Sequence, residues 1–299
     1  MSRYDDLMAR IARGERVLID GGTGTEVDRR GVPQLENAWN GGGTLSHPDI
    51  VCGIHHDYIS HGAEIIISNT FSATRHALQD AGEAALFDDY NRRGVELAIE
   101  ARTASGRDNV LVAGGISYWS WTGRHPDVES LGQDVTRQAQ VMADAGADLL
   151  MLEMMVGIDR MLVTLQAAQA CGLPVWVGLS CRPNDQGQMA LYDGDLLFDA
   201  LAALDGRGVP LISIMHTQVA YVDACLDIVD QAWAGPVGVY AHTGTEIDTK
   251  WTFHDTITPR DYADNARRWL DRGVQVIGGC CGIRPEHIAT MAPLVEAEA

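Results

Sequence analysis

The sequence lacks a long apolar stretch and has few basic residues. No window approaches the roughly 18 to 20 continuous apolar residues of a membrane-spanning helix, and the N-terminal segment lacks the apolar core of a secretory signal. We therefore expect a cytoplasmic protein without a membrane partner. Lys and Arg number 22 against 41 Asp and Glu, which gives a formal charge of −19. Such a field repels phosphate backbones and anionic lipids, so nucleic acid is not an expected partner.

Cysteine is also sparse, with six residues among 299. This number is too small for a disulfide scaffold in a chain of this length. The composition, 46% apolar and 21% charged residues, is typical of a globular protein with one large core. No Pro-, Ser- or Gly-rich linker divides the sequence, so we expect a single domain over residues 1–299.

A short apolar run followed by a stretch with helical periodicity recurs along the chain. The predicted strands are 17–19, 64–68, 109–113, 148–152, 174–179, 210–215, 236–240 and 274–277. The predicted helices include 48–61, 87–103, 134–145, 159–171 and 259–272. Eight such alternations predict an α/β fold, the (β/α)8 or TIM barrel. An open doubly wound sheet is the alternative, which the missing GxGxxG after the first strand disfavours.

Polar, thiol and imidazole groups follow nearly every predicted strand. They are Asp20-Gly21-Gly22, Asn69-Thr70-Phe71, Gly114-Gly115, Glu153, Ser180-Cys181, His216-Thr217, Ala241-His242-Thr243 and Gly278-Gly279-Cys280-Cys281. The reactive residues of a barrel gather at the carboxyl ends of its strands. We therefore expect these groups to converge on one mouth.

Cys280 and Cys281 form the strongest candidate for a metal site. Glycines on both sides of the pair allow a sharp turn that directs both sulfurs to one ion. Zinc takes thiolate and imidazole ligands, and a catalytic zinc site has three protein ligands and one open position. His216, Cys181 and His242 are candidates for the third ligand, and spacing does not choose among them. Two buried thiols or a vicinal disulfide are the alternative interpretations of the pair.

Several segments carry a resemblance to a known family. They are LIDGGTGTEVDRRG (18–31), Trp39, HPDIVCGIHHDYISHGAEIIISNTFSAT (47–74), VAGGIS (112–117), GADLLMLE (146–153) and GGCCGIRPEHI (278–288). Together they resemble the zinc-dependent homocysteine S-methyltransferases, and the last segment is the most specific. The resemblance implies a (β/α)8 barrel enzyme with Zn²⁺, in which homocysteine accepts a methyl group from a small cationic donor and becomes methionine.

The sequence departs from the family pattern at two positions. The family has cysteine, its third zinc ligand, where this chain has His216, and asparagine where this chain has His242. We interpret His216, Cys280 and Cys281 as the zinc ligands. An imidazole in place of a thiolate removes one negative charge, so the substrate thiol should ionise more readily and be a weaker nucleophile. This favours a reactive sulfonium donor, such as S-methylmethionine or dimethylsulfoniopropionate, over betaine.

Roles for further residues follow from the resemblance and from the chemistry of a cationic donor. The resemblance implies that Glu153 receives the amino group of homocysteine and that Asp20 organises a loop, Gly21-Gly22-Thr23, whose amides receive the carboxylate. Trp39 is the leading aromatic partner of the donor cation. The remaining candidates are Tyr118 and Tyr240, with Trp119 and Trp121, for an aromatic cage, Asn69 and Thr70 for orienting the pocket, and His242 near the donor or behind the metal ligands.

Two alternatives to this function remain at the level of sequence. The chain could use another thiol or donor, or could be a non-catalytic barrel that binds an amino acid or a metal. The number of subunits stays open, a homo-oligomer included.

Overall fold

Eight parallel strands form the centre of the computed structural model, which describes residues 2–247, 250–253 and 257–296. They are β1 (Val17–Leu18), β2 (Ile65–Ile67), β3 (Leu111–Ile116), β4 (Leu149–Met155), β5 (Val175–Leu179), β8 (Ile212–Gln218), β9 (Val237–His242) and β12 (Val276–Ile277). Their order is β1-β12-β9-β8-β5-β4-β3-β2. A parallel bridge between Ile19, next to β1, and Ile65 of β2 joins the two ends of this order. This closure confirms the predicted (β/α)8 barrel.

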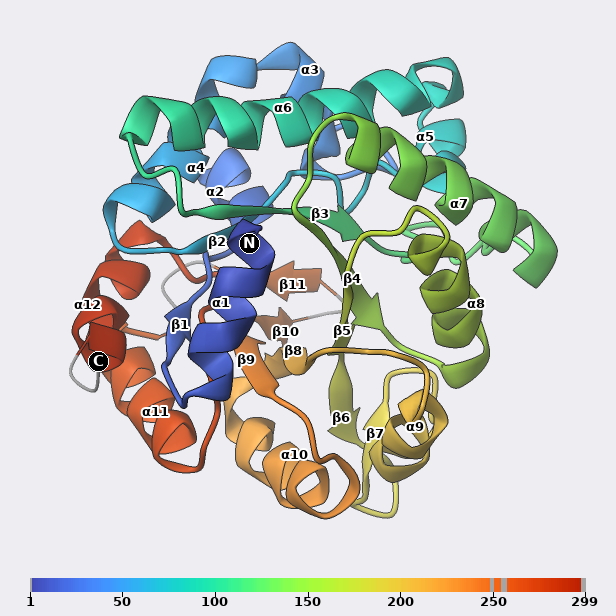
Figure 1. Cartoon of the computed structure of the whole chain (residues 1–299). Coiled ribbons are helices and arrows are strands. Elements are labelled where there is room, and N and C mark those ends of the chain that lie inside the picture. Colours follow the sequence, from blue (N-terminus) through green and yellow to red (C-terminus); the bar gives the residue numbers. More distant parts are fainter. Residues whose placement is uncertain (1, 248–249, 254–256, 297–299) are drawn as a thin grey trace.

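Helices surround the strands (Figure 1). They are α1 (Arg3–Ala12), α2 (Thr23–Arg29), α3 (Gly43–Ser46), α4 (Pro48–Ser60), α5 (Arg75–Asp80), α6 (Phe87–Ser105), α7 (Val128–Asp144), α8 (Ile158–Gln169), α9 (Leu197–Leu204), α10 (Val219–Ala232), α11 (Pro259–Asp271) and α12 (Pro285–Glu296), with 3₁₀ turns η1 (Asn40–Gly42) and η2 (Ala84–Leu86). Within the described ranges, every helix is too short or too polar to cross a lipid bilayer.

Local sequence signals account for the helix boundaries. Pro48 and Pro259 occupy the first turns of α4 and α11, where a missing amide hydrogen costs nothing. The Thr258 side chain caps α11 by accepting a hydrogen bond from the Asp261 amide. Gly62 and Gly273, which follow α4 and α11, have φ angles of 106° and 96°. Glycine adopts this left-handed conformation without a Cβ penalty, so it ends these helices cleanly.

Several barrel strands continue beyond their predicted ends. Glu153 lies inside β4, His216 inside β8, and His242 is the last residue of β9. The pairing register shifts between Leu152 and Met155 and again between Met215 and Gln218. These irregularities are β-bulges, which re-aim side chains near the end of a strand. The predicted ends of these three strands are thus wrong by two or three residues, but the groups still lie at the carboxyl end of the barrel.

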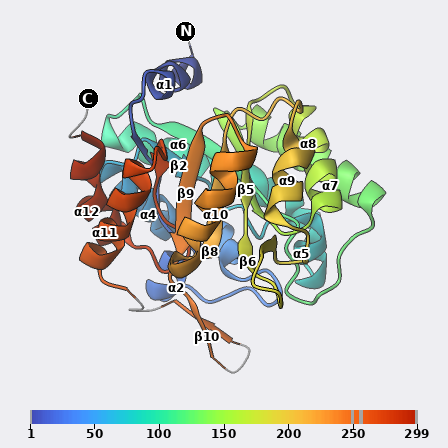
Figure 2. The same cartoon turned by 90° about the horizontal axis from the view of Figure 1, so that it is seen from below.

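Three elements lie outside the predicted alternation. Helix α1 packs at the amino ends of the strands, where Arg10 pairs with Glu64 just before β2 and the Trp176 indole donates to the Tyr4 hydroxyl. Two hairpins, β6 (Cys181–Pro183) with β7 (Met189–Leu191) and β10 (Thr245–Ile247) with β11 (Lys250–Thr252), are antiparallel additions. Figure 2 shows α1 and β10 at opposite ends of the barrel. One end is therefore covered by a helix, and the other is shaped by loops.

Candidate active site

A cavity of about 510 Å³ lies among the loops that follow the barrel strands. Of the residues predicted to form the site, it is lined by Gly21, Gly22, Thr23, Trp39, Asn69, Glu153, His216, Tyr240, Cys280 and Cys281. These residues span 260 positions of sequence and come from both ends of the chain. Barrel closure brings them together, as expected for groups at strand ends.

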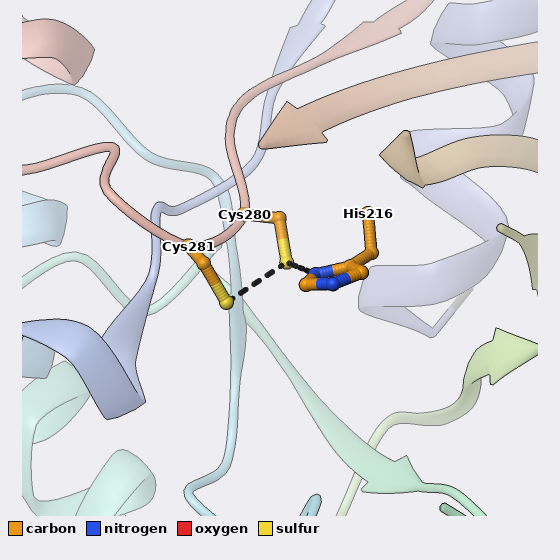
Figure 3. A group of neighbouring side chains, drawn as sticks. All are labelled: His216, Cys280 and Cys281. Atoms are coloured by element: carbon orange, nitrogen blue, oxygen red, sulfur yellow. Dashed lines mark hydrogen bonds between the residues drawn. The ribbon is translucent and has the colours of Figure 1, made fainter. Parts of the chain in front are cut away.

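Cys280, Cys281 and His216 form a compact group at this cavity (Figure 3). Cys280 Sγ lies 3.5 Å from His216 Nδ1 and 3.7 Å from Cys281 Sγ. One ligand atom from each residue lies within 4.8 Å of the other two. Both cysteines are free thiols, so the alternative of a vicinal disulfide does not apply to this structure. In the part of the chain that the structure describes, no other group of His, Cys, Asp or Glu meets this spacing.

The two separations from Cys280 Sγ match those of a tetrahedral zinc site, and the third pair, His216 and Cys281, lies within 4.8 Å. With Zn–S bonds of about 2.3 Å and Zn–N bonds of about 2.0 to 2.1 Å, tetrahedral geometry separates two sulfurs by about 3.8 Å and a sulfur from a nitrogen by about 3.5 Å. The observed separations are 3.7 and 3.5 Å. Two thiols and one imidazole are also donors that zinc prefers. Three protein ligands would leave one position for a substrate atom.

Local backbone features hold the three residues in place. A Cβ added at Gly278 would lie 2.7 Å from the backbone oxygens of both Ile19 and Asp20, so only glycine lets the cysteine segment pass so close to β1. His216 has a φ angle of 40° within the bulge of β8. A non-glycine residue in this region is strained and must be held by its surroundings. The Tyr192 hydroxyl contributes by donating to the His216 carbonyl at 3.0 Å.

His242 supports His216 rather than joining the group of His216, Cys280 and Cys281. Their rings are stacked, with centroids 4.4 Å apart and an interplanar angle of 17°. The Gly244 amide donates to His242 Nδ1 at 2.9 Å. Burial lowers the pKa of His242 to about 4, and burial together with repulsion from His242 lowers the pKa of His216 well below its usual value. Both rings are thus neutral at pH 7, and a neutral imidazole is the form that binds zinc.

Cys181, the other sequence candidate for a third ligand, lies away from this group. It is fully buried, outside the cavity lining, and its amide donates to the Thr217 hydroxyl at 2.9 Å. Of the three candidates that spacing left open, the structure places His216 beside the cysteine pair.

Glu153 presents an isolated carboxyl group to the cavity. Only 9% of the residue is exposed, and the described residues offer it no hydrogen-bond or ion-pair partner. Burial raises the pKa of this carboxyl to about 8. Gly115 makes room for it, because a Cβ there would lie 2.6 Å from Glu153 Oε2. A buried carboxyl without a partner is costly in its charged form, and an ammonium group in the cavity would relieve that cost.

Asp20 lies behind the cavity and organises the backbone. Its Oδ2 accepts a hydrogen bond from the Ile67 amide at 2.8 Å, which links β1 to β2. In the following loop, the Gly22 amide donates to the Ile283 carbonyl and the Thr23 amide donates to the Gly21 carbonyl, each at 2.9 Å. These two amides are therefore engaged within the protein, and the role of the Gly21-Gly22-Thr23 loop toward a carboxylate stays a prediction. Thr23 lines the cavity, and its buried Oγ1 has no partner among the described residues.

Two predicted site residues have structural roles outside the cavity lining. The Thr70 hydroxyl donates to the Gly115 carbonyl at 2.7 Å and ties the loop after β2 to β3. The Tyr118 hydroxyl accepts hydrogen bonds from the amides of Val156 and Gly157 at 2.8 and 3.0 Å, and its side chain is fully buried. The prediction that Tyr118 belongs to an aromatic cage is wrong, because its ring is inside the protein and its hydroxyl holds the loop after β4.

Trp39, Phe71 and Trp121 form an aromatic cluster on the cavity wall. Their ring centroids are 6.0 to 6.5 Å apart in every pair, and all three side chains are half-buried. Trp119 and Tyr240 also line the cavity. The Tyr240 hydroxyl is buried and has no partner within the described ranges. Asn69 shapes this wall by donating to the Asn40 carbonyl and the Thr44 hydroxyl.

Sequence reasoning assigned no role in the site to several lining residues. Phe71 directly follows the predicted polar pair after β2, so its position was a usable signal. Tyr192 follows the β6–β7 hairpin and Phe253 follows β11. No periodic pattern marks either residue, because both lie in loops outside the repeating strand and helix units.

Several known proteins that are similar to this chain are named as methyltransferases. The chain is 25% identical to a selenocysteine methyltransferase of Astragalus bisulcatus, over 92% of this chain and 91% of the relative. It is 26% identical to homocysteine S-methyltransferase 1 of Zea mays, over 99% and 98% of the two chains. The metallated form of the Escherichia coli homocysteine methyltransferase MmuM has the same fold, with a TM-score of 0.80, 24% identity and coverage of 96% and 99%.

A family model described as homocysteine S-methyltransferase matches residues 17–295. This range contains all eight barrel strands and every residue of the cavity lining. The chain therefore belongs to the homocysteine S-methyltransferase family of enzymes.

Proposed function

We propose that this chain is a zinc-dependent methyltransferase, with one catalytic domain, that methylates the thiol of homocysteine from a small sulfonium donor and forms methionine. The observation that carries this proposal is the group of His216, Cys280 and Cys281. The distances from Cys280 Sγ to the other two ligand atoms fit zinc, and the group lines the same cavity as Glu153 and the aromatic cluster. In the transfer, a bond forms between the thiolate sulfur and the methyl carbon. The bond from that carbon to the sulfonium sulfur breaks, and its electron pair leaves with a neutral thioether.

The ligand set determines how readily a thiol ionises in the cavity. A zinc ion held here would act as a Lewis acid and keep the substrate thiol deprotonated at neutral pH, where a free thiol near pKa 8.5 is mostly protonated. Two thiolates and a neutral His216 carry one negative charge fewer than three thiolates. The substrate sulfur therefore ionises more readily and is a weaker nucleophile than beside three cysteines, which favours a reactive methyl donor.

Glu153 and Thr23 are suited to hold the amino acid part of the acceptor. The carboxyl group of Glu153 faces the cavity without a protein partner and would pair with the ammonium group. The Thr23 hydroxyl, also without a partner among the described residues, is a donor for the carboxylate. Two fixed contacts of this kind orient the sulfur, and good orientation can be worth about 7 to 11 kcal/mol of the barrier.

The aromatic cluster is suited to bind the cationic donor. A methylated sulfonium or ammonium centre is attracted to the faces of Trp and Phe rings. Trp39, Phe71 and Trp121 present three rings on one wall. The protein also carries a net charge of −19, which favours the approach of a cation over that of an anion.

Metal analysis of single variants tests the ligand assignment. We expect H216A and C280S to lose most of the zinc that the wild-type protein retains after dialysis, because each removes one of three ligands. C171S is the matched control, since Cys171 is a free thiol outside the cavity, and it should bind zinc as the wild type does. Wild-type zinc content in both H216A and C280S would refute the three-ligand site.

A donor panel tests the reaction itself. We expect methionine to form from homocysteine faster with S-methylmethionine or dimethylsulfoniopropionate than with glycine betaine. A clear preference for betaine would refute the argument from the His216 ligand set. Absence of transfer from every donor would instead favour a non-catalytic binding protein.

A different acceptor is the second candidate, because one of the relatives is named a selenocysteine methyltransferase. The same panel with selenocysteine in place of homocysteine decides between them. A higher kcat/KM for the selenol would assign the enzyme to that acceptor with the same metal site and donor wall.

A further inference from the structure

The rings of the aromatic cluster come from three separate loops. Trp39 lies between α2 and η1, in the connection after β1, whereas Phe71 follows β2 and Trp121 follows β3. Strand pairing sets the positions of the strands, but it does not set the distance between rings several residues beyond their ends. A cage for one cation needs that distance to be fixed, since cation–π attraction requires each ring within about 6 Å of the charge. Contacts outside the barrel must therefore hold the loops.

Asp80, the last residue of α5, bonds to the loops of both tryptophans. Its carboxylate accepts hydrogen bonds from the Thr122 hydroxyl at 2.7 Å and from the Arg124 guanidinium at 2.5 Å. Its backbone carbonyl accepts a hydrogen bond from the Asn37 side chain at 3.1 Å. Thr122 is next to Trp121 in the chain, and Asn37 is two residues before Trp39. One residue thus connects the two loops through its side chain and its main chain.

The loop of Trp39 needs such support because its backbone is strained. Asn37 and Trp39 have φ angles of 63° and 45°, and a bulky aromatic residue rarely adopts this conformation. Strained residues persist only where neighbouring contacts over-determine them. The Leu35 amide donates to the Trp39 carbonyl at 2.8 Å, and the Trp39 ring lies so close to Gly24 that a Cβ there would be 2.7 Å away. The bond from Asn37 to Asp80 is a further tie, to an element outside the loop.

The loop of Trp121 is tied to the same helix at a second point. His76 Nε2 lies 2.9 Å from the Trp119 carbonyl, and His76 belongs to α5, as Asp80 does. Asp80 does not line the cavity of the aromatic cluster. It lines a separate hollow of about 450 Å³ instead. Any effect of Asp80 on a ligand in the main cavity must therefore act through the loops that it holds.

We propose that Asp80 is a positioning residue for the methyl donor: by joining the loops of Trp39 and Trp121, it holds the two indole rings at the spacing that receives one onium cation. The inference rests on the proposed function for its ligand, but the contacts of Asp80 do not depend on it. Loss of the Asp80 carboxylate removes the tie at Thr122 and Arg124, leaves the one at Trp119, and so loosens the loop of Trp121 without moving the acceptor and metal residues. The expected signature is weaker donor binding with unchanged acceptor binding.

The first test reads the indole rings directly in the zinc-loaded protein. Fluorine NMR of 5-fluorotryptophan-labelled D80A should show a shifted or broadened Trp121 resonance, with the resonances of the core residues Trp176 and Trp269 unchanged. D88N is the matched control, because Asp88 pairs with Arg137 between α6 and α7, outside the cavity lining. An unchanged Trp121 resonance in D80A would overturn the proposal.

The second test separates donor from acceptor. We expect D80A to raise the KM for S-methylmethionine by about fivefold to tenfold, which is the range of one lost stabilising contact. The KM for homocysteine and the zinc content should stay within about twofold of wild type. D80N keeps an oxygen acceptor for Thr122 and should lie between D80A and wild type. A donor KM unchanged in D80A overturns the proposal.

A titration with trimethylsulfonium distinguishes this inference from the proposed function. If the wild-type tryptophan resonances do not respond to this cation, the cationic donor and the donor role of Asp80 both fail. If the wild type responds and D80A responds at the same concentration, the role of Asp80 fails alone. A weaker response in D80A than in wild type and D88N supports the proposal.

Discussion

Burial sets the charge of the key side chains in the cavity. His216 and His242 are neutral at pH 7, because burial lowers the pKa of each ring. In the absence of a bound ligand, Glu153 is mostly protonated at pH 7, because burial raises its pKa to about 8. Each state suits a proposed partner: a neutral imidazole for a metal, and a carboxyl group that ionises when a cation arrives.

The pKa of Glu153 predicts how ligand binding depends on pH. Methionine, the proposed product, has no thiol, so its binding reports on the ammonium contact without thiol ionisation. An ammonium group binds the ionised carboxylate, so methionine affinity should rise by about tenfold per pH unit below pH 8 and level off above it. Calorimetric titration between pH 6.5 and 8.5 measures this. E153Q, which cannot ionise, should bind weakly at every pH in this range, and an equally steep rise in E153Q would contradict the assignment.

Among the secondary-structure elements, the bulges of β4 and β8 place the chemistry. Both strands lose regular register just before their carboxyl ends, and each bulge contains a non-glycine residue with positive φ, Met154 at 52° and His216 at 40°. The amide of Met154 donates to the sulfur of Met215 at 3.1 Å, so the two bulges contact one another. Strain of this kind tends to occur where a side chain must be held in one orientation. Here it holds Glu153 and His216 toward the cavity.

Position 278, after β12, has room only for glycine. Adding one methyl group there should lower the stability of the protein. G278A would force a Cβ against the backbone oxygens of Ile19 and Asp20, just after β1, so we expect a loss of at least about 2 kcal/mol in the free energy of unfolding. Zinc content should fall with it, because Cys280 is two residues away. Urea denaturation and metal analysis measure the two effects.

Gly53 in α4 provides the control for this substitution. A Cβ at position 53 meets only the Arg30 side chain, at 3.7 Å. Alanine favours a helix interior over glycine by about 1 kcal/mol, so G53A should be as stable as wild type or slightly more stable. Equal stability of G278A and G53A would show that the close approach to β1 is unimportant.

For the molecule as a whole, closure of the barrel connects the two ends of the chain. β1 pairs with β12 on one side and reaches β2 through the bridge of Ile19 and Ile65 on the other. The group of His216, Cys280 and Cys281 therefore has one member from β8 and two from the segment after β12, which lies beside the segment that follows β1. Global unfolding and loss of the metal site are expected to coincide.

A buried histidine in α4 predicts how global stability depends on pH. His55 is fully buried, neither ring nitrogen has a partner among the described residues, and burial lowers its pKa to about 4. In the unfolded chain its pKa is about 6.5. As the pH falls below 6.5, His55 binds a proton in the unfolded state but stays neutral in the folded state until the pH is near 4. The free energy of unfolding should therefore fall by up to about 3 kcal/mol between pH 6.5 and 4 from this residue.

The variant H55L isolates this contribution. It keeps an apolar side chain at the position and cannot be protonated, so its stability should decline less steeply than that of wild type over the same pH range. Urea denaturation at pH 6.5, 5.5 and 4.5 gives the comparison. Parallel curves for the two proteins would mean that His55 does not contribute to acid sensitivity.

The sequence by itself determined the barrel and the cysteine pair. Alternating apolar runs and helical periods, with proline at helix starts and glycine at helix ends, are local signals that each element carries within itself. The vicinal cysteines and their glycines are likewise adjacent in sequence, so their shared direction could be inferred without a fold. The family resemblance added expectations for Glu153 and Trp39, both of which line the cavity.

Only the tertiary structure decided which distant residues meet. It placed His216 beside the cysteines, left Cys181 in the core and set His242 behind His216. It also turned Tyr118 inward and engaged the amides of Gly22 and Thr23. These outcomes depend on strand register, on two bulges and on contacts between loops far apart in the sequence. No local pattern encodes such contacts, because each is set by the relative position of two segments that fold against a common barrel.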